Sequence, residues 1–288
     1  MILRFQPLLK TLVWGTENWV LSGVKGSETT VAEGPLAGKT LNEVYGREFP
    51  LLIKFIDARQ DLSIQVHPDD ALAAERHGCR GKTEMWYIMD TAPGARIVSG
   101  FSKAITPDEY QMLAESGNIM DVLTVHDVAP GDVFFLPAGR VHSICGGCHL
   151  AEIQETSDIT YRIFDYNRPG LDGKPRQLHT ELARAAIDYT VHPDYRTHYE
   201  HAADEEVLLV RDPHFNASMY DLTQPMEVSM EDKGDFLAVI CTEGSGLVGG
   251  VHINAGEALL ADYSENSISF VPEGAKLKLL TSYVPDPI

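Results

Sequence analysis

The stretch from which the fold can be read is Ser63-Ile64-Gln65-Val66-His67-Pro68. Its polar residues alternate with two apolar ones, and this period of two is typical of a β-strand. On a strand, Ser63, Gln65 and His67 share one face. Two interpretations of this polar face are open: it is exposed to solvent, or it lines a polar cavity that holds a metal ion. The stretch alone favours neither, so the rest of the chain has to decide.

The composition is that of a globular protein. The chain has 288 residues, of which 44% are hydrophobic and 23% charged, enough for two domains or one large one. No run approaches the roughly 18 apolar residues of a membrane span, and residues 1–7 lack the apolar segment of a secretory signal. We therefore expect a cytoplasmic protein that does not interact with a membrane.

The formal net charge is −19. A nucleic-acid-binding protein needs a clustered basic face, so we expect no nucleic-acid partner. A strongly acidic chain also disfavours an anionic membrane surface. If the substrate is an anion, its site must be a local cluster of Lys and Arg.

Two of the four cysteines, Cys145 and Cys148, have C-x-x-C spacing. A zinc ribbon needs a second such pair, and Cys79 and Cys241 are isolated, so a redox or zinc function is the weaker interpretation. The two glycines between Cys145 and Cys148 favour a tight turn. We expect four free thiols in a reducing compartment.

Many short apolar or alternating segments, separated by Gly and Pro turns, predict an all-β fold. The segment 243–246 is one of the predicted turns. Thr106-Pro107 begins a helical insert at about 106–123, and a linking helix is expected over 177–188. Lys54 interrupts the apolar run 49–56, where a lysine is rare unless it is functional or extends its ammonium to an edge.

Residues 131–142 follow the pattern G-x5-P-x-G-x2-H, and the pattern is partly repeated at 256–274 without the His. The first copy resembles the second signature motif of the cupin superfamily, in which the closing His is a metal ligand. This resemblance implies two cupin-type jelly-roll barrels or sandwiches. We expect a metal-binding domain over 1–190 and a degenerate cupin-like domain without a metal site over 205–288.

With this motif in place, the metal interpretation of the polar strand gains support. Gln65 and His67 on one strand, Glu84 on the next and His142 on a third form one candidate ligand set. Two imidazoles, a carboxylate and an amide oxygen suit one Zn²⁺ per chain, although Mn²⁺, Co²⁺ or Fe²⁺ accept similar ligands. Either His taken alone is more often a core residue bonded to the backbone.

Four stretches then extend the resemblance to essentially the whole chain: residues 62–68, 81–87, 137–142 and 152–168, the last of which includes 157–162. They occur in the same order as in the type I mannose-6-phosphate isomerases, which the chain resembles in their short bacterial form. The resemblance implies interconversion of mannose 6-phosphate and fructose 6-phosphate through an enediol. It also implies the metal ligands Gln65, His67, Glu84 and His142, with Lys54, Ser63, Lys82, Glu152, Asp158 and Arg162 around the sugar phosphate.

Moving a proton between C1 and C2 requires a cation near the sugar oxygens, a base and a phosphate site. We expect Arg162 to stabilise the enediolate, and Ser63, Lys82 and Arg162 to bind the substrate. The base is open among Lys54, Glu152 and Asp158. The only partner we expect is the sugar phosphate, and the sequence does not distinguish a monomer from a homodimer.

Two rival functions would use part of the same residue pattern. An iron-dependent cupin dioxygenase usually carries H-x-H with a Glu three or four residues later, whereas this chain has Gln65 in place of the first His and a distant Glu84. Oxygen uptake with ferrous iron would support that rival. A sugar-binding cupin without enzymatic activity would lose its metal ligands, and this chain retains them.

Overall fold

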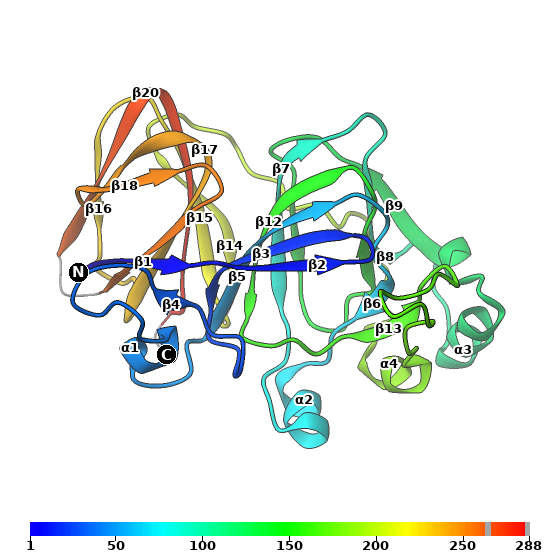
Figure 1. The fold of residues 1–288 in the computed structure, drawn as a ribbon. Coiled ribbons are helices and arrows are strands. Elements are labelled where there is room, and N and C mark those ends of the chain that lie inside the picture. Colours follow the sequence, from blue (N-terminus) through cyan, green and yellow to red (C-terminus); the bar gives the residue numbers. More distant parts are fainter. Residues whose placement is uncertain (263–265, 286–288) are drawn as a thin grey trace. The chain divides into compact units, whose positions relative to one another are not determined.

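The computed structural model describes residues 1–262 and 266–285 and is rich in strands (Figure 1). The strands are β1 Ile2–Gln6, β2 Leu8–Leu12, β3 Gly15–Ser22, β4 Thr30–Val31, β5 Leu51–Ala58, β6 Ile64–Val66, β7 Glu84–Thr91, β8 Arg96–Phe101, β9 Leu123–Asp127, β10 Val133–Leu136, β11 His142–Ile144, β12 Cys148–Glu155, β13 Tyr161–Phe164, β14 Glu206–Arg211, β15 Asn216–Leu222, β16 Met226–Ser229, β17 Phe236–Val248, β18 Val251–Asn254, β19 Ala258–Asp262 and β20 Ser267–Tyr283. The all-β prediction is therefore confirmed.

The few helices are short. They are α1 Leu41–Tyr45, α2 Asp70–His77, α3 Pro107–Ser116 and α4 Thr180–Ala186, with a 3₁₀ turn, η1, at Ile119–Val122. Thr106 caps α3 as predicted: its hydroxyl accepts from the Glu109 amide, and the Glu109 carboxylate accepts from the Thr106 amide. The linking helix α4 is shorter than the predicted 177–188, because its N-cap position, His179, makes no side-chain capping bond.

Contacts within the chain divide it into two compact units. The first comprises residues 1–8, 19–55 and 197–288, and the second comprises 9–18 and 56–196. The two predicted domains, 1–190 and 205–288, stay a prediction. Residues 263–265 and 286–288 of the second predicted domain lie outside the described residues. Among residues 1–262 and 266–285, no helix is both long and apolar enough to cross a membrane.

The first unit is built on a nine-stranded sheet in the order β14-β15-β20-β17-β19-β1-β4, with β16 on β20 and β18 on β17. Apolar residues from alternate positions of these strands form its core, which includes Tyr220, Val239 and Phe270. The predicted turn at 243–246 is wrong, because β17 continues through it. Register shifts at Cys241/Glu243 and Gly244/Gly246 bend the strand instead.

The second unit holds a five-stranded sheet, β13-β6-β11-β8-β9, and the strands β10, β7 and β12, which pair side by side. Ile64, Val66 and Ile163 from the five-stranded sheet pack with Tyr110 of α3 and Ala183 of α4. Apolar residues thus cover the face of β6 that the alternation predicted to be buried. The opposite face of β6 carries Ser63, Gln65 and the start of the candidate site.

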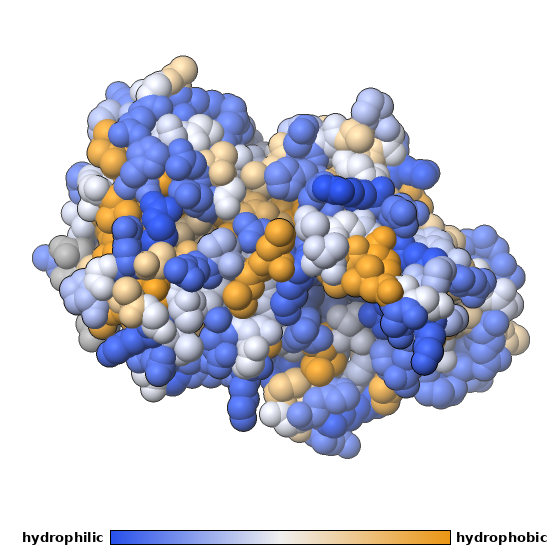
Figure 2. All heavy atoms as spheres, viewed as in Figure 1, coloured by the Kyte–Doolittle hydropathy of each residue, from blue (hydrophilic) through white to orange (hydrophobic). Residues whose placement is uncertain are grey.

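The face drawn in Figure 2 is mostly hydrophilic, with scattered hydrophobic side chains. Large hydrophobic residues that are exposed include Leu9, Met112 and Leu171. Single exposed apolar residues are normal on a globular protein and require no special function.

Candidate metal centre

Three neighbouring strands of the second unit align polar residues in one row. Gln65 on β6 lies opposite His142 on β11 and, on its other side, opposite Arg162 on β13. Directly opposed residues of antiparallel strands project to the same face. Ser63 and His67 are buried, with 2% and 1% exposure. The polar stripe therefore faces inward, and its interpretation as a solvent face is wrong.

His67, Glu84 and His142 form a compact cluster at this row. Their ligand-type atoms all lie within 4.8 Å of one another. Glu84 contacts both rings, with Oε2 at 3.6 Å from Nε2 of His67 and Oε1 at 3.3 Å from Nε2 of His142. All three side chains are 1% exposed. Two imidazoles and a carboxylate arranged in this way can hold a divalent metal ion.

Backbone carbonyls set the orientation of both imidazoles. Nδ1 of His67 lies 2.7 Å from the Ile159 carbonyl oxygen, and Nδ1 of His142 lies 2.8 Å from that of Arg140. Each Nδ1 therefore donates a proton, which leaves each Nε2 with a lone pair; that of His67 lies 3.0 Å from Nζ of Lys82, which can only donate to it. Burial, followed by the charge of Lys82, lowers the pKa of His142 to about 3. Neutral imidazoles with this orientation are the form that binds a metal, so the residues fit one.

Gln65 adjoins the cluster through its carboxamide. Its Nε2 lies 3.3 Å from Nε2 of His142, and its Oε1 accepts from the Ser63 hydroxyl at 3.3 Å. The oxygen and nitrogen of an amide are assigned from such contacts, and a half-turn of the amide exchanges them. The carboxamide thus lies where its oxygen can serve as a further ligand.

Lys82 places an ammonium inside the cluster. Its Nζ donates to Glu84 Oε2 and lies 3.0 Å from Nε2 of His67. It also lies 3.6 Å from Oε1 of Glu152. The other oxygen of Glu152, Oε2, accepts from the indole nitrogen of Trp86 at 2.7 Å. The structure therefore brings Lys82 and Glu152 together with the predicted metal ligands.

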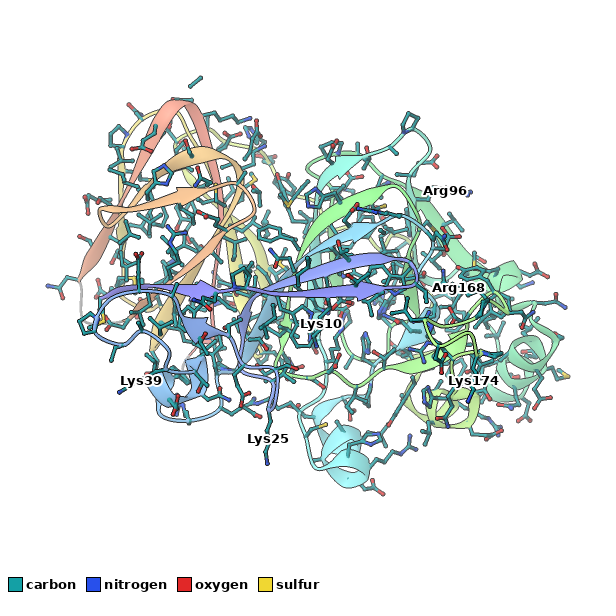
Figure 3. All side chains as sticks on the ribbon, in the orientation of Figure 1. Lys10, Lys25, Lys39, Arg96, Arg168 and Lys174 are labelled. Carbon is teal, nitrogen blue, oxygen red and sulfur yellow. The ribbon has the colours of Figure 1, made fainter. Side chains whose placement is uncertain are left out.

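Arg162 lies at the β13 end of the polar row. Its Nη1 donates to the Gln177 carbonyl at 3.0 Å. Burial and then the nearby charge of Arg176 lower the pKa of Arg162. Arg168 and Arg176 both bind the Asp165 carboxylate, and Figure 3 labels Arg168. The expectation that Lys and Arg form a local basic cluster for an anionic substrate stays a prediction.

The remaining predicted residues differ in their surroundings. Asp158 is exposed in the loop between β12 and β13. Lys54 is 5% exposed in the part of β5 that belongs to the first unit, with its Nζ 5.6 Å from the centre of the Trp19 ring. The catalytic role of Lys54 stays a prediction.

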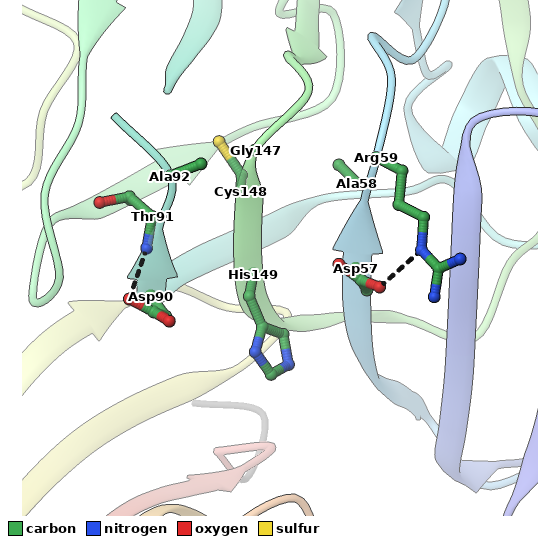
Figure 4. A pocket seen from close by; sticks show the side chains of 9 residues that line it. All are labelled: Asp57, Ala58, Arg59, Asp90, Thr91, Ala92, Gly147, Cys148 and His149. Carbon is green, nitrogen blue, oxygen red and sulfur yellow. Dashed lines mark hydrogen bonds and ion pairs between the residues drawn. The ribbon is translucent and has the colours of Figure 1, made fainter. Parts of the chain in front are cut away.

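A separate cavity of about 550 Å³ opens at the other ends of β7 and β12 (Figure 4). Asp57, Asp90 and His149 line it, and Arg59 pairs with Asp57 at 3.2 Å. None of the predicted site residues lines this cavity. The convergent ligand-type atoms lie at the His67–Glu84–His142 cluster, so we take that cluster as the candidate active site.

Sequence reasoning missed three groups at the site. Trp86 was noted only as part of a strand, although its place two residues after Glu84 puts both on one strand face. The carbonyls of Arg140 and Ile159 carried no signal, because a backbone group has no side chain to mark it.

Fold and site together define a β-sheet enzyme with a His/Glu cluster suited to a metal. The family model "Phosphomannose isomerase type I, catalytic domain" matches residues 10–93. Mannose-6-phosphate isomerase ManA of Bacillus subtilis is 32% identical over 91% of this chain and 93% of its own length. A putative mannose-6-phosphate isomerase of the same organism, YvyI, is 35% identical over 84% and 85%. The chain therefore belongs to the mannose-6-phosphate isomerases, a family of isomerases.

Solved structures agree with this assignment. The crystal structure of mannose 6-phosphate isomerase from Bacillus subtilis superposes with a TM-score of 0.88 at 28% identity, covering 98% of this chain and 99% of that one. A putative mannosephosphate isomerase from Archaeoglobus fulgidus gives 0.79 at 17% identity over 99% and 97%. A zinc-bound mannose 6-phosphate isomerase gives 0.75 at 15% identity over 99% of both chains. The last two show the common fold.

Proposed function

We propose that this protein interconverts mannose 6-phosphate and fructose 6-phosphate in a metal-dependent reaction. The observation that carries the proposal is the buried His67–Glu84–His142 cluster, whose two Nε2 atoms face one carboxylate. Family membership supplies the substrate pair. A protein that only bound sugars would have no need for this ligand geometry.

The residues that would hold the metal are Gln65, His67, Glu84 and His142. The donor set suits Zn²⁺, and a solved structure with the same fold is described as zinc-bound. When bound, the ion would act as a Lewis acid that polarises the sugar oxygens at C1 and C2. Other divalent ions with similar ligand preferences are alternatives.

The chain's own residues would divide the remaining tasks. Arg162 would stabilise the negative charge of the enediolate, because its guanidinium stays charged in a partly buried position. Ser63, Lys82 and Arg162 would bind the sugar phosphate. Lys82 would exchange its contacts with His67 and Glu84 for Glu152, whose Oε1 lies 3.6 Å from its Nζ.

The base that moves the proton between C1 and C2 stays open among Lys54, Glu152 and Asp158. Glu152 is the one that the cluster contacts, through Lys82. Trp86 holds its Oε2, so the carboxylate has a fixed orientation. We further propose that the protein works in the cytoplasm on this small substrate, as a monomer or homodimer, without nucleic acid or membrane.

The test is turnover between the two sugar phosphates before and after chelation, with metal content measured on the same samples. We expect turnover that EDTA abolishes and added Zn²⁺ restores. His142→Ala should lose both bound metal and turnover, whereas His149→Ala, in the separate cavity, should retain both. Turnover that survives complete removal of metal would contradict the proposal, and oxygen uptake with ferrous iron would favour the dioxygenase rival.

A further inference from the structure

Gln154 is a buried polar residue to which no role has been given so far. It lies on β12 directly opposite Glu84 on β7, so the two side chains project to the same face. Its side chain is 0% exposed. A fully buried glutamine beside a candidate metal ligand requires an account of each of its hydrogen bonds.

The amide nitrogen of Gln154 holds the loop that follows β12. Nε2 donates to the carbonyl oxygens of Glu155 and Ser157, each at 2.8 Å. Two carbonyls accept these bonds, and only the NH₂ end of the amide has two protons to give. The orientation of the amide is therefore fixed by chemistry, and its nitrogen ties residues 155–157 together.

From this loop a chain of hydrogen bonds leads to His67. The Ser157 hydroxyl donates to the Arg80 carbonyl at 3.0 Å and accepts from the Ile159 amide at 3.4 Å. The Ile159 carbonyl oxygen in turn lies 2.7 Å from Nδ1 of His67. Gln154 thus holds the loop whose carbonyl sets the orientation of His67.

The other end of the amide adds a second observation. Oε1 of Gln154 is buried and has no hydrogen-bond partner within residues 1–262 and 266–285. An unsatisfied buried acceptor costs about 1–3 kcal/mol. An apolar side chain of similar size would avoid this cost but could not donate to two carbonyls. In Gln154, therefore, an unsatisfied oxygen that destabilises the fold accompanies two N–H donors that hold the loop.

We propose that Gln154 is a positioning residue of the metal centre. By holding the 155–159 loop it keeps the Ile159 carbonyl against Nδ1 of His67 and so orients the ring, whose Nε2 lies on the side of Lys82 and Glu84. Its effect is on metal affinity, through His67, and it touches neither metal nor substrate. This inference rests on the proposed function, because it assumes that the cluster binds a metal.

The test is the Zn²⁺ affinity of the full chain, measured by competition with a chromogenic chelator. We expect Gln154→Met, which keeps the side-chain length and removes both donors, to bind Zn²⁺ about 10–100-fold more weakly. In the metal-free protein, ¹⁵N NMR of His67 should show the Nδ1–H form in the wild type and a mixture of tautomers in the variant. Gln154→Leu, which likewise lacks both donors, should behave like Gln154→Met.

A matched control is available in the first unit. Asn42 also holds a loop through its amide, with Nδ2 donating to the Gly23 carbonyl at 2.8 Å and Oδ1 accepting from the Phe49 amide at 2.9 Å. Asn42→Leu should lower thermal stability and leave Zn²⁺ affinity and the His67 tautomer unchanged. A general loss of stability would therefore not reproduce the effect expected at Gln154.

The outcomes separate the two proposals. If the wild type binds no metal, the proposed metal centre fails, and the His67 tautomer still decides the role of Gln154. If Gln154→Met and Gln154→Leu match the wild type in both affinity and tautomer, the positioning role is overturned. If both variants fail to fold, the test is made on the wild type, by NMR couplings across the hydrogen bonds from Nε2 of Gln154 to the two carbonyls. The absence of these couplings would overturn the inference.

Discussion

At the scale of single residues, backbone carbonyls determine what the two imidazoles can do. Nδ1 of His67 and of His142 each bind a carbonyl oxygen, so neither ring is free to turn its protonated nitrogen toward Glu84. A metal ligand needs a free lone pair in a fixed direction. These two contacts therefore hold both rings in the orientation that the proposed metal binding requires.

Arg162 allows the proposed electrostatic role to be tested at this scale. Arg162→Ala removes a partly buried charge at the end of the polar row, and we expect turnover to fall by about 10²-fold because the enediolate loses its stabilising cation. Metal content should stay at the wild-type level. The measurement is steady-state turnover together with metal analysis. Arg184→Ala, on the exposed side of α4, is the control and should keep full turnover, while unchanged turnover in Arg162→Ala would refute the role.

The sequence could predict much of this site because side chains with distinctive chemistry lie in short motifs. Gln65 and His67 come from one alternating stretch, and His142 closes the G-x5-P-x-G-x2-H pattern. The structure brings Glu84 to them although it is 17 positions from His67 along the chain. Lys82, two positions before Glu84, was predicted to share its face, whereas its contacts with His67 and Glu152 depend on pairing between distant strands, which no local pattern specifies.

At the scale of elements, capping signals made the helices easier to predict than the long strands. Thr106 and Pro107 start α3 where expected, because capping is a local interaction. β17 and β20 extend well beyond the apolar segments from which the sequence predicts these strands. Gly244, with φ of 77°, lies inside β17 at a register shift, where local sequence resembles a turn. Only the partner strand decides between a bend and a turn.

The segment after β13 supports a prediction about an ion-pair cluster. Asp165, with a side-chain exposure of 5%, accepts two hydrogen bonds from Arg176 at 2.6 Å and two from Arg168 at 2.9 and 3.0 Å. Burial raises the pKa of Asp165, but the hydrogen bonds and charge of Arg176, with those of Arg168, outweigh it and lower the pKa overall. We expect Asp165→Asn to lower the free energy of unfolding at pH 7 by about 2–3 kcal/mol.

The pH dependence of this effect has a definite sign. Because folding lowers the pKa of Asp165, the ionised carboxylate stabilises the fold above its unfolded pKa of about 3.9. This contribution is lost as the pH falls from there through the lowered pKa. The difference in the free energy of unfolding between wild type and Asp165→Asn, measured with urea, should therefore be smaller below pH 4 than at pH 7. Asp108→Asn, at an exposed ion pair with Arg184, should show little effect at either pH.

At the scale of the whole molecule, the first unit is discontinuous in sequence. β1 pairs with β19, placing Ile2 opposite Ala261 and Arg4 opposite Leu259. Strands some 250 residues apart thus lie side by side in one sheet. The repeat in the sequence predicted a C-terminal β domain over 205–288. It could not show that an N-terminal strand completes the sheet, because strand pairing between distant segments leaves no periodic signal in either one.

This pairing predicts how a fragment should behave. Without β1, β19 becomes an edge strand that exposes unpaired backbone and the apolar residues Leu259 and Leu260. We expect a fragment of residues 205–288 to be destabilised by this open edge. A synthetic peptide of residues 1–8 should raise the temperature at which half of the fragment is unfolded, and more so at higher peptide concentration, because a ligand that binds only the folded state stabilises it. Circular dichroism during heating measures the midpoint.

A peptide with Leu3→Pro, which cannot donate from that position, is the control and should have a weaker effect. A fragment that melts at the same temperature with and without the wild-type peptide would show that 205–288 folds as an independent domain and that β1 contributes nothing to its stability.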